Sequence, residues 1–129
     1  MPVPKVGETS VVASGTYSSV TKPANLIFSD AKAFREYWEK IQTATPKPRP
    51  PLLDFASCRV AVLQLGTKPT GGYGIRFDSV TADTSSITLR YTEIVPGPRD
   101  ATTQALTSPY LVVKIPRTPS KVIFINVKK

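Results

Sequence analysis

The spacing of hydrophobic positions predicts one amphipathic helix in the first third of the chain. Ser29 is expected to be its N-cap, because a serine hydroxyl can accept a hydrogen bond from a free backbone N–H. Asp30 follows and favours the positive end of the helix dipole. The apolar stripe has i, i+3, i+4, i+7 spacing and comprises Phe34, Tyr37, Trp38 and Ile41. We therefore expect Trp38 to be buried against strands, with a ligand platform as the alternative.

Apolar and polar positions alternate elsewhere in the chain and predict strands. Residues 9–17 indicate a short strand, and the apolar segment 25–28 leads into the helix. Residues 59–65 are apolar at nearly every position, which is typical of a central strand covered on both faces. Further strands are predicted at 72–80, 86–95, 110–115 and 122–127, and their succession predicts a β meander.

The distribution of prolines bears on whether these elements form one domain or two. Four prolines within residues 45–51 predict an extended connector. This connector is too short to separate two domains, because the helix stripe needs the later strands to pack against. We therefore predict a single α+β domain over residues 1–129, a mostly antiparallel β-sheet or sandwich-like domain with one packed N-terminal helix. Residues 1–8 are expected to form a loose arm.

Composition is that of a soluble globular domain, with 40% hydrophobic and 20% charged residues. No apolar stretch approaches the ~20 residues of a membrane-spanning helix. The first residues lack the basic region and apolar core of a signal peptide. Two locations stay open: the cytoplasm, and the cell envelope or extracellular space for a chain whose export signal is absent from this sequence.

The net charge of +8 raises the question of nucleic-acid binding. Lysines and arginines are scattered singly, and the densest groups are at residues 47–49 and 128–129. Neither group alternates with aromatic residues, as is common in proteins that bind single strands. We expect no specific nucleic-acid binding. The charge instead favours solubility and attraction for acidic partners.

Missing residue types exclude several kinds of catalytic site. The chain has no histidine, which rules out a Ser-His-Asp triad, a Cys-His pair and a histidine-ligated zinc site. Cys58 is the single cysteine and is expected to be a small buried hydrophobe. Residues 71–74 lack the spacing of a phosphate-binding loop. We predict no catalytic residues, no metal and no cofactor. A competing enzyme would have to use residues outside any recognisable motif: Asp54, Asp78, Glu93, Asp100 or Ser108.

The glycine-rich segment 65–77 is the most informative part of the chain. Glycines 66, 71 and 72 permit positive φ and close backbone approach, and Pro69 stiffens the turn. A stiff loop on a β scaffold is a common recognition surface, although a simple hairpin connection favours the same residues.

Two loops form the candidate binding surface, residues 67–73 and 103–110. Tyr73 and Tyr110 would be aromatic anchors, with core packing as the alternative for both. A single functional surface requires the two loops to converge in space, which strands of one sandwich allow. The candidate binding residues are Lys68, Pro69, Thr70, Gly71, Gly72 and Tyr73 in the first loop and Thr107, Ser108, Pro109 and Tyr110 in the second.

Several segments resemble one protein family. The Pro-Thr-Gly-Gly-Tyr sequence within residues 65–77 resembles the signature of the PrcB-type C-terminal domain, named for an accessory subunit of a bacterial protease complex. Thr-Ser-Pro-Tyr at 107–110 resembles its second block, and residues 93–98 resemble the stretch between them. The best match covers residues 54–115. The resemblance implies an exported bacterial, non-enzymatic domain that stabilises or binds a protein partner such as a protease.

A looser similarity suggests an alternative function. Residues 69–73 are similar to the Asn-Pro-Thr-Thr-Gly-Tyr loop of chagasin-type cysteine-protease inhibitors, which are β-sandwiches with binding loops at one end. Lys68 replaces the asparagine and Gly71 the second threonine. Protease inhibition is therefore a second hypothesis. A small-ligand or carbohydrate binder that stacks its ligand on Trp38 or the tyrosines is a third.

Overall fold

A computed structural model describes residues 10–43, 49–97, 104, 106–117 and 121–127. The predicted loose arm at 1–8 and most of the proline-rich connector lie outside the described residues. The described part contains seven strands and one helix. In chain order these are β1 (Ser10–Gly15), β2 (Ala24–Phe28), α1 (Ala31–Ile41), β3 (Cys58–Gln64), β4 (Gly74–Ala82), β5 (Ser86–Ile94), β6 (Tyr110–Pro116) and β7 (Lys121–Asn126).

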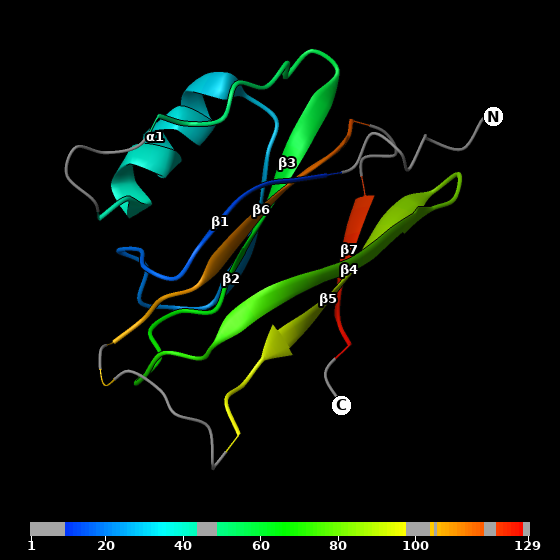
Figure 1. Cartoon of the computed structure of the whole chain (residues 1–129). Coiled ribbons are helices and arrows are strands. Elements are labelled where there is room, and N and C mark those ends of the chain that lie inside the picture. Colours follow the sequence, from blue (N-terminus) through cyan, green and yellow to red (C-terminus); the bar gives the residue numbers. More distant parts are fainter. Residues whose placement is uncertain (1–9, 44–48, 98–103, 105, 118–120, 128–129) are drawn as a thin grey trace.

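The strands form two sheets that pack face to face (Figure 1). One sheet has four strands in the order β1-β6-β3-β2, and the other has three in the order β4-β5-β7. All pairings are antiparallel except β5 with β7, which is parallel. Helix α1 covers the outer face of the four-stranded sheet. The predicted α+β, sandwich-like fold with one packed helix is confirmed.

The predicted β meander is wrong. Strand β3 pairs with β2 and β6, whereas the next strand, β4, belongs to the other sheet. The segment 65–73 therefore crosses between sheets and is not a hairpin connection. The physical reason lies in the strands themselves. Every residue of β3 is buried, so β3 must be covered on both faces, whereas β4 has exposed positions suited to a sheet with one open face.

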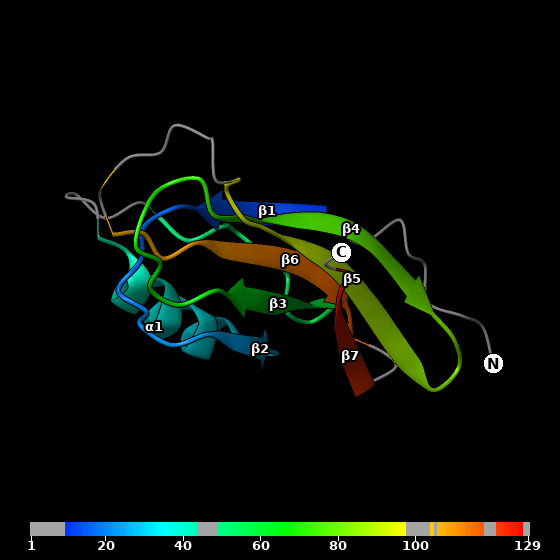
Figure 2. The same ribbon diagram turned by 90° about the horizontal axis from the view of Figure 1, so that it is seen from below.

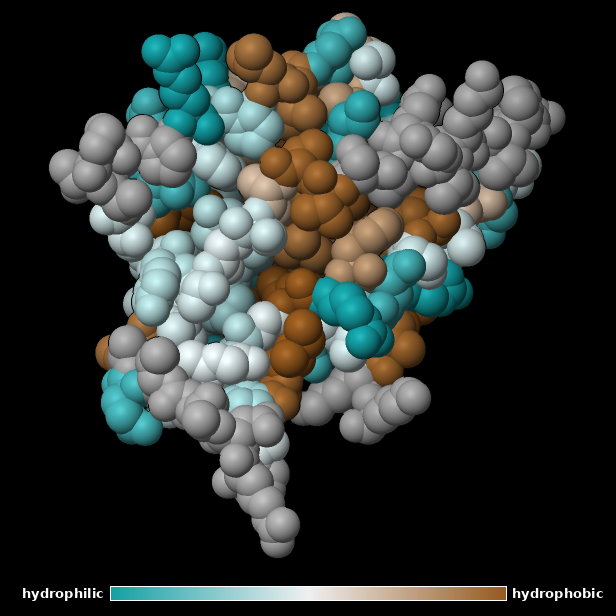
Figure 3. Space-filling view, in the orientation of Figure 1, coloured by the Kyte–Doolittle hydropathy of each residue, from teal (hydrophilic) through white to brown (hydrophobic). Residues whose placement is uncertain are grey.

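Strand β3 contributes to two hydrophobic cores, one on each face. Ala61 and Leu63 point into the core between the sheets. Val60 and Val62 point toward α1, where Phe34 is 1% exposed and Trp38 is 5% exposed. The predicted packing of the helix stripe is confirmed. Figure 3 shows hydrophobic side chains between the β1 and β4 edges, where the inter-sheet core reaches the surface.

The helix begins one residue later than predicted. Asp30 is the N-cap, and its Oδ2 accepts a hydrogen bond from the Ala33 backbone N–H at 2.9 Å. Ser29 lies one position too early to cap the free N–H groups of α1, and its carbonyl instead accepts from Arg117 at 3.3 Å. Cys58 is buried at the start of β3, as predicted.

Candidate functional site

Three chain connections meet at one end of the sandwich (Figures 1 and 2). They are residues 16–23 between β1 and β2, residues 65–73 between β3 and β4, and residues 106–109 before β6. The turn between β4 and β5, residues 83–85, lies at the opposite end of its hairpin. We call the first group of connections the loop end.

The two loops predicted to converge do so. Lys68 and Thr107 form an isolated antiparallel bridge, in which the Lys68 N–H donates to the Thr107 carbonyl at 2.7 Å. The Thr107 N–H donates in return to the Lys68 carbonyl at 3.0 Å. The Thr107 hydroxyl also donates to the Thr70 carbonyl at 2.8 Å. These bonds connect two segments that are far apart in the sequence.

Ser108 ties the remaining loop to this pair. Its hydroxyl donates to the Val20 carbonyl at 2.6 Å and accepts from the Ser18 hydroxyl at 2.8 Å. Its backbone N–H donates to the Thr16 carbonyl at 2.8 Å. These bonds occupy the Ser108 hydroxyl in a structural network, and Ser108 is only 4% exposed. The geometry therefore gives Ser108 a supporting role in the loop end.

Positive φ occurs at two of the three loop glycines singled out from the sequence. Gly66 has φ 77° and Gly72 has φ 90°. A Cβ on Gly66 would lie 2.8 Å from the Pro23 backbone nitrogen, which is shorter than a van der Waals contact allows. Gly66 thus allows the first loop to pass directly against the 16–23 connection.

Tyr73 is half-buried at the base of the first loop. The Lys68 Nζ lies 5.4 Å from the centroid of its ring, which is within cation–π range. The same ammonium lies 3.5 Å from the Glu93 Oε2. Lys68 therefore holds an aromatic ring of the loop and a carboxylate of β5 together.

Residues of the second candidate block face inward. Tyr110 packs edge-to-face on Trp38 with 6.4 Å between ring centroids, and its hydroxyl accepts from the Gln42 Nε2 at 3.3 Å. Tyr110 is therefore part of the core under α1 and is not placed as an exposed anchor. The whole block is buried because it enters the central strand β6: Thr107, Ser108, Pro109 and Tyr110.

Two exposed hydrophobic side chains at the loop end are not among the candidate binding residues, although Leu106 lies within the candidate loop 103–110. Tyr17 is 53% exposed and Leu106 is 67% exposed. Both line a shallow cleft of ≈ 320 Å³, together with Thr67 and Ser18. Tyr17 is the last residue of the predicted strand 9–17, and Leu106 is a single apolar residue in a polar stretch. The sequence around Tyr17 or Leu106 does not indicate that the side chain is exposed in a loop.

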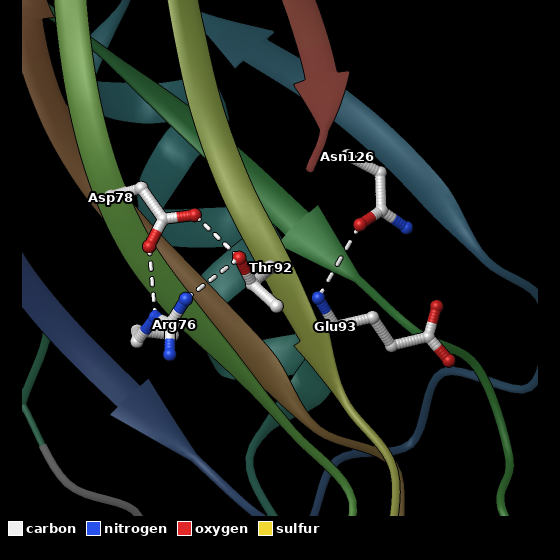
Figure 4. Close-up of polar contacts among 5 residues, drawn as sticks. All are labelled: Arg76, Asp78, Thr92, Glu93 and Asn126. Carbon is white, nitrogen blue, oxygen red and sulfur yellow. Dashed lines mark hydrogen bonds and ion pairs between the residues drawn. The ribbon is translucent and has the colours of Figure 1, made fainter. Parts of the chain in front are cut away.

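The carboxylates that a competing enzyme would use are separated in the fold, and those described form structural hydrogen bonds or an ion pair. Asp54 accepts from the Ala56 N–H in a local turn. Asp78 accepts from Arg76 and Thr92 on the outer face of the three-stranded sheet, while the Glu93 backbone N–H donates to Asn126 (Figure 4). The Thr92 hydrogen bond and the Arg76 guanidinium lower the Asp78 pKa. Asp100 lies outside the described residues.

Among the residues that the structure describes, no three or more histidine, cysteine or acidic side chains gather into a possible metal site. Within the same residues, α1 is neither long nor apolar enough to span a membrane.

Comparison with known proteins finds a similarity to one family model. The model described as PrcB C-terminal matches residues 59–116, slightly under half of the 129-residue chain. This segment includes β3 to β6, the 65–73 connection and the second candidate block. No curated protein and no solved structure matches the chain. Residues 59–116 of the chain are thus similar to the PrcB C-terminal family.

Proposed function

We propose that this chain is a non-enzymatic accessory domain that binds a partner protein through its loop end. The main support is the hydrogen-bonded convergence of three connections, with the Lys68–Thr107 bridge at its centre. A surface held in place in advance loses less conformational entropy on binding than mobile loops lose. The candidate residues that are accessible are Lys68, Pro69, Thr70, Gly72 and Tyr73.

Exposed hydrophobic side chains supply contact area at this surface. Tyr17 and Leu106 flank the ≈ 320 Å³ cleft. Aromatic and apolar side chains that enter a partner's surface commonly carry most of the binding free energy. The buried block 107–110 would act indirectly, by keeping the first loop in position.

The partner we propose is a bacterial protease or another protein of the cell envelope. The support is the similarity of residues 59–116 to the PrcB C-terminal family, which is named for an accessory subunit of a protease complex. The net charge of +8 favours a partner with an acidic surface. On the same reasoning, we propose that the protein acts in the cell envelope or outside the cell.

A matched pair of variants tests the loop-end surface. Leu106→Asp adds a charge at the loop end, and Thr84→Asp adds the same charge in the exposed turn at the opposite end. Each variant and the parent would be used to capture exported proteins of the source bacterium, with quantification by mass spectrometry. We expect one protein to be captured by the parent and by Thr84→Asp, and at least about tenfold less by Leu106→Asp.

The comparison requires both variants to be folded and similarly stable. Circular dichroism and the urea midpoint serve as controls, because a lost fold would also lose the partner. Equal capture by two folded variants would reject the loop end as the binding surface.

A chagasin-type inhibitor is the second candidate function. The observation in its favour is that the Pro-Thr-Gly-Gly-Tyr segment lies with two other connections at one end of a β-sandwich. Activity measurements on the captured protease separate the two functions. An accessory domain would lengthen the half-life of the protease on heating and leave peptide hydrolysis intact. An inhibitor would suppress peptide hydrolysis at stoichiometric concentration.

A further inference from the structure

The edge strands on the two sides of the sandwich differ in regularity. On one side, β1 has a register shift between Val11 and Ala13, and β4 has one between Phe77 and Ser79. On the other side, β2 and β7 pair without any register shift (Figure 2). Bulges protect edges against pairing with further strands. One side of the molecule thus lacks this protection.

Strand β2 is an open edge suited to pairing. It pairs with β3 in continuous register from Ala24 with Gln64 to Phe28 with Val60, and it has no other strand partner among the described residues. Its sequence, Ala-Asn-Leu-Ile-Phe, contains no charged residue and no proline. Ile27, its fourth residue, is 36% exposed. None of the usual side-chain devices for blocking an edge is present in this strand.

A groove lies on each face of β2. The groove on the α1 side has a volume of ≈ 460 Å³ and is lined by Leu26, Tyr37 and Lys40 among others. The groove on the side of the three-stranded sheet has a volume of ≈ 340 Å³ and is lined by Asn25 and Glu93 among others. Ala24 and Gln64, which pair with each other, line both grooves. An added strand points successive side chains to opposite faces, so two grooves flanking one edge match its geometry.

Two residues that line the α1-side groove, Tyr37 and Gln64, each have a buried polar atom without a protein partner. The Gln64 Oε1 and the Tyr37 hydroxyl are buried and lack hydrogen bonds, and Gln64 is 7% exposed. Burial raises the pKa of Tyr37, so its hydroxyl stays protonated and can donate. Buried polar groups are normally satisfied in folded proteins.

The charges at the two grooves differ. Lys22 and Lys40 line the α1-side groove, and no acidic side chain lines it among the described residues. The other groove contains the Lys68–Glu93 ion pair, in which the two charges offset each other. The α1-side groove thus attracts acidic side chains, whereas the opposite groove has no net preference.

We propose that the free edge of β2 binds an extended acidic segment of a partner protein as an added strand. Backbone hydrogen bonds to β2 hold the segment, and its acidic side chains lie on the α1 side near Lys22 and Lys40. Edge strand β7 is the weaker choice because it begins with Lys121 and lines neither groove. This inference rests on the proposed protein-binding function and adds a second site to it.

A synthetic Asp-Val-Asp-Val-Asp-Val-Asp peptide is the probe, titrated into the ¹⁵N-labelled protein and followed by amide chemical shifts. We expect the largest shifts at residues 24–28 and at residues lining the two grooves. Lys40→Glu should weaken binding about fivefold, since it replaces an attraction by a repulsion at an exposed site. Lys32→Glu makes the same charge change on the same helix but lies outside the groove, and should match the parent.

A peptide with alternate backbone amides N-methylated tests the strand pairing itself. It keeps every charge but loses backbone donors, and we expect no saturable shifts with it. Equal affinity of Lys40→Glu and Lys32→Glu would overturn the proposal. So would shifts confined to loop-end residues that line neither groove, such as Tyr17, Thr70 and Leu106. Shifts at β2 that depend on protein concentration without peptide would assign the edge to a second copy, and would also overturn it.

Leu106→Asp separates this site from the loop end. It should bind the peptide as the parent does while failing to capture the partner protein. If Leu106→Asp also loses peptide binding, the claim that the edge and the loop end are separate sites is contradicted. If the peptide does not bind the parent but partner capture is still lost in Leu106→Asp, only the edge site is rejected and the loop-end site stands.

Discussion

The two sheets of the sandwich differ in how many of their faces are covered. Helix α1 covers the outer face of the four-stranded sheet, so all seven residues of the inner strand β3 are buried. The outer face of the three-stranded sheet is open and carries polar groups such as Arg76, Asp78 and Thr92 (Figure 4). Stability should therefore depend more on contacts across the covered face than on contacts across the open one.

The largest expected effect is at the covered face. Trp38 is 5% exposed and packs on Phe34 and Tyr110. Trp38→Ala should lower the free energy of unfolding by ~3–5 kcal/mol, through lost burial and a residual cavity. Urea denaturation measures this change, and Lys32→Ala on the exposed side of α1 is the control. A Trp38→Ala protein as stable as the control would show that α1 contributes little to the covered sheet.

An intermediate effect is expected where the chain passes from one sheet to the other. Gly66 has φ 77°, and a Cβ there would lie 2.8 Å from the Pro23 nitrogen. Gly66→Ala should cost at least ~1–2 kcal/mol from the left-handed backbone alone. In Gly74→Ala, at the other end of the same connection, the new Cβ would meet Ile94 at an ordinary 3.7 Å. Equal urea midpoints for the two variants would contradict a tight crossing at Gly66.

The smallest effect is expected on the open sheet and its turn, and it depends on pH. Hydrogen bonds from Thr92 and then Arg76 lower the Asp78 pKa, and backbone hydrogen bonds from Ser85 and Ser86 lower the Asp83 pKa. A lowered folded-state pKa means that the stabilisation is present above the ordinary carboxyl pKa. It is lost as pH falls through the folded-state value.

The double variant Asp78→Asn/Asp83→Asn isolates this contribution. Its urea midpoint should fall less than that of the parent between pH 7 and pH 3. The difference should be small because both carboxyl groups are solvent-exposed. An identical fall in the two proteins would show that these carboxylates do not contribute to acid sensitivity.

Local patterns were sufficient for the individual elements. The i, i+3, i+4, i+7 stripe identified the buried face of α1, and consecutive apolar residues identified β3 as a strand covered on both sides. The N-cap was misplaced by one residue because Ser29 and Asp30 are both good capping residues. Only the backbone geometry shows that the Asp30 carboxylate reaches the Ala33 N–H.

The candidate site was predicted in part. The approach of residues 67–73 to residues 107–110 was expected and is observed through Lys68 and Thr107. The exposure of individual residues did not follow from residue type, because Tyr110 and Tyr17 are both tyrosines at a boundary of a predicted strand. One packs on Trp38 and the other faces solvent. Burial at such positions depends on segments far away in the chain.

The sequence by itself determined the local structure of this protein: an amphipathic helix, apolar and alternating strands, and a stiff glycine-rich loop. These properties arise from the period of hydrophobic residues and the backbone preferences of glycine and proline, which act over a few neighbouring positions. Only the tertiary structure decided which strands pair. It placed β3 and β4 in different sheets, brought three connections together and left β2 as a regular edge. Pairing depends on which faces can be buried together, and this is a property of the whole chain.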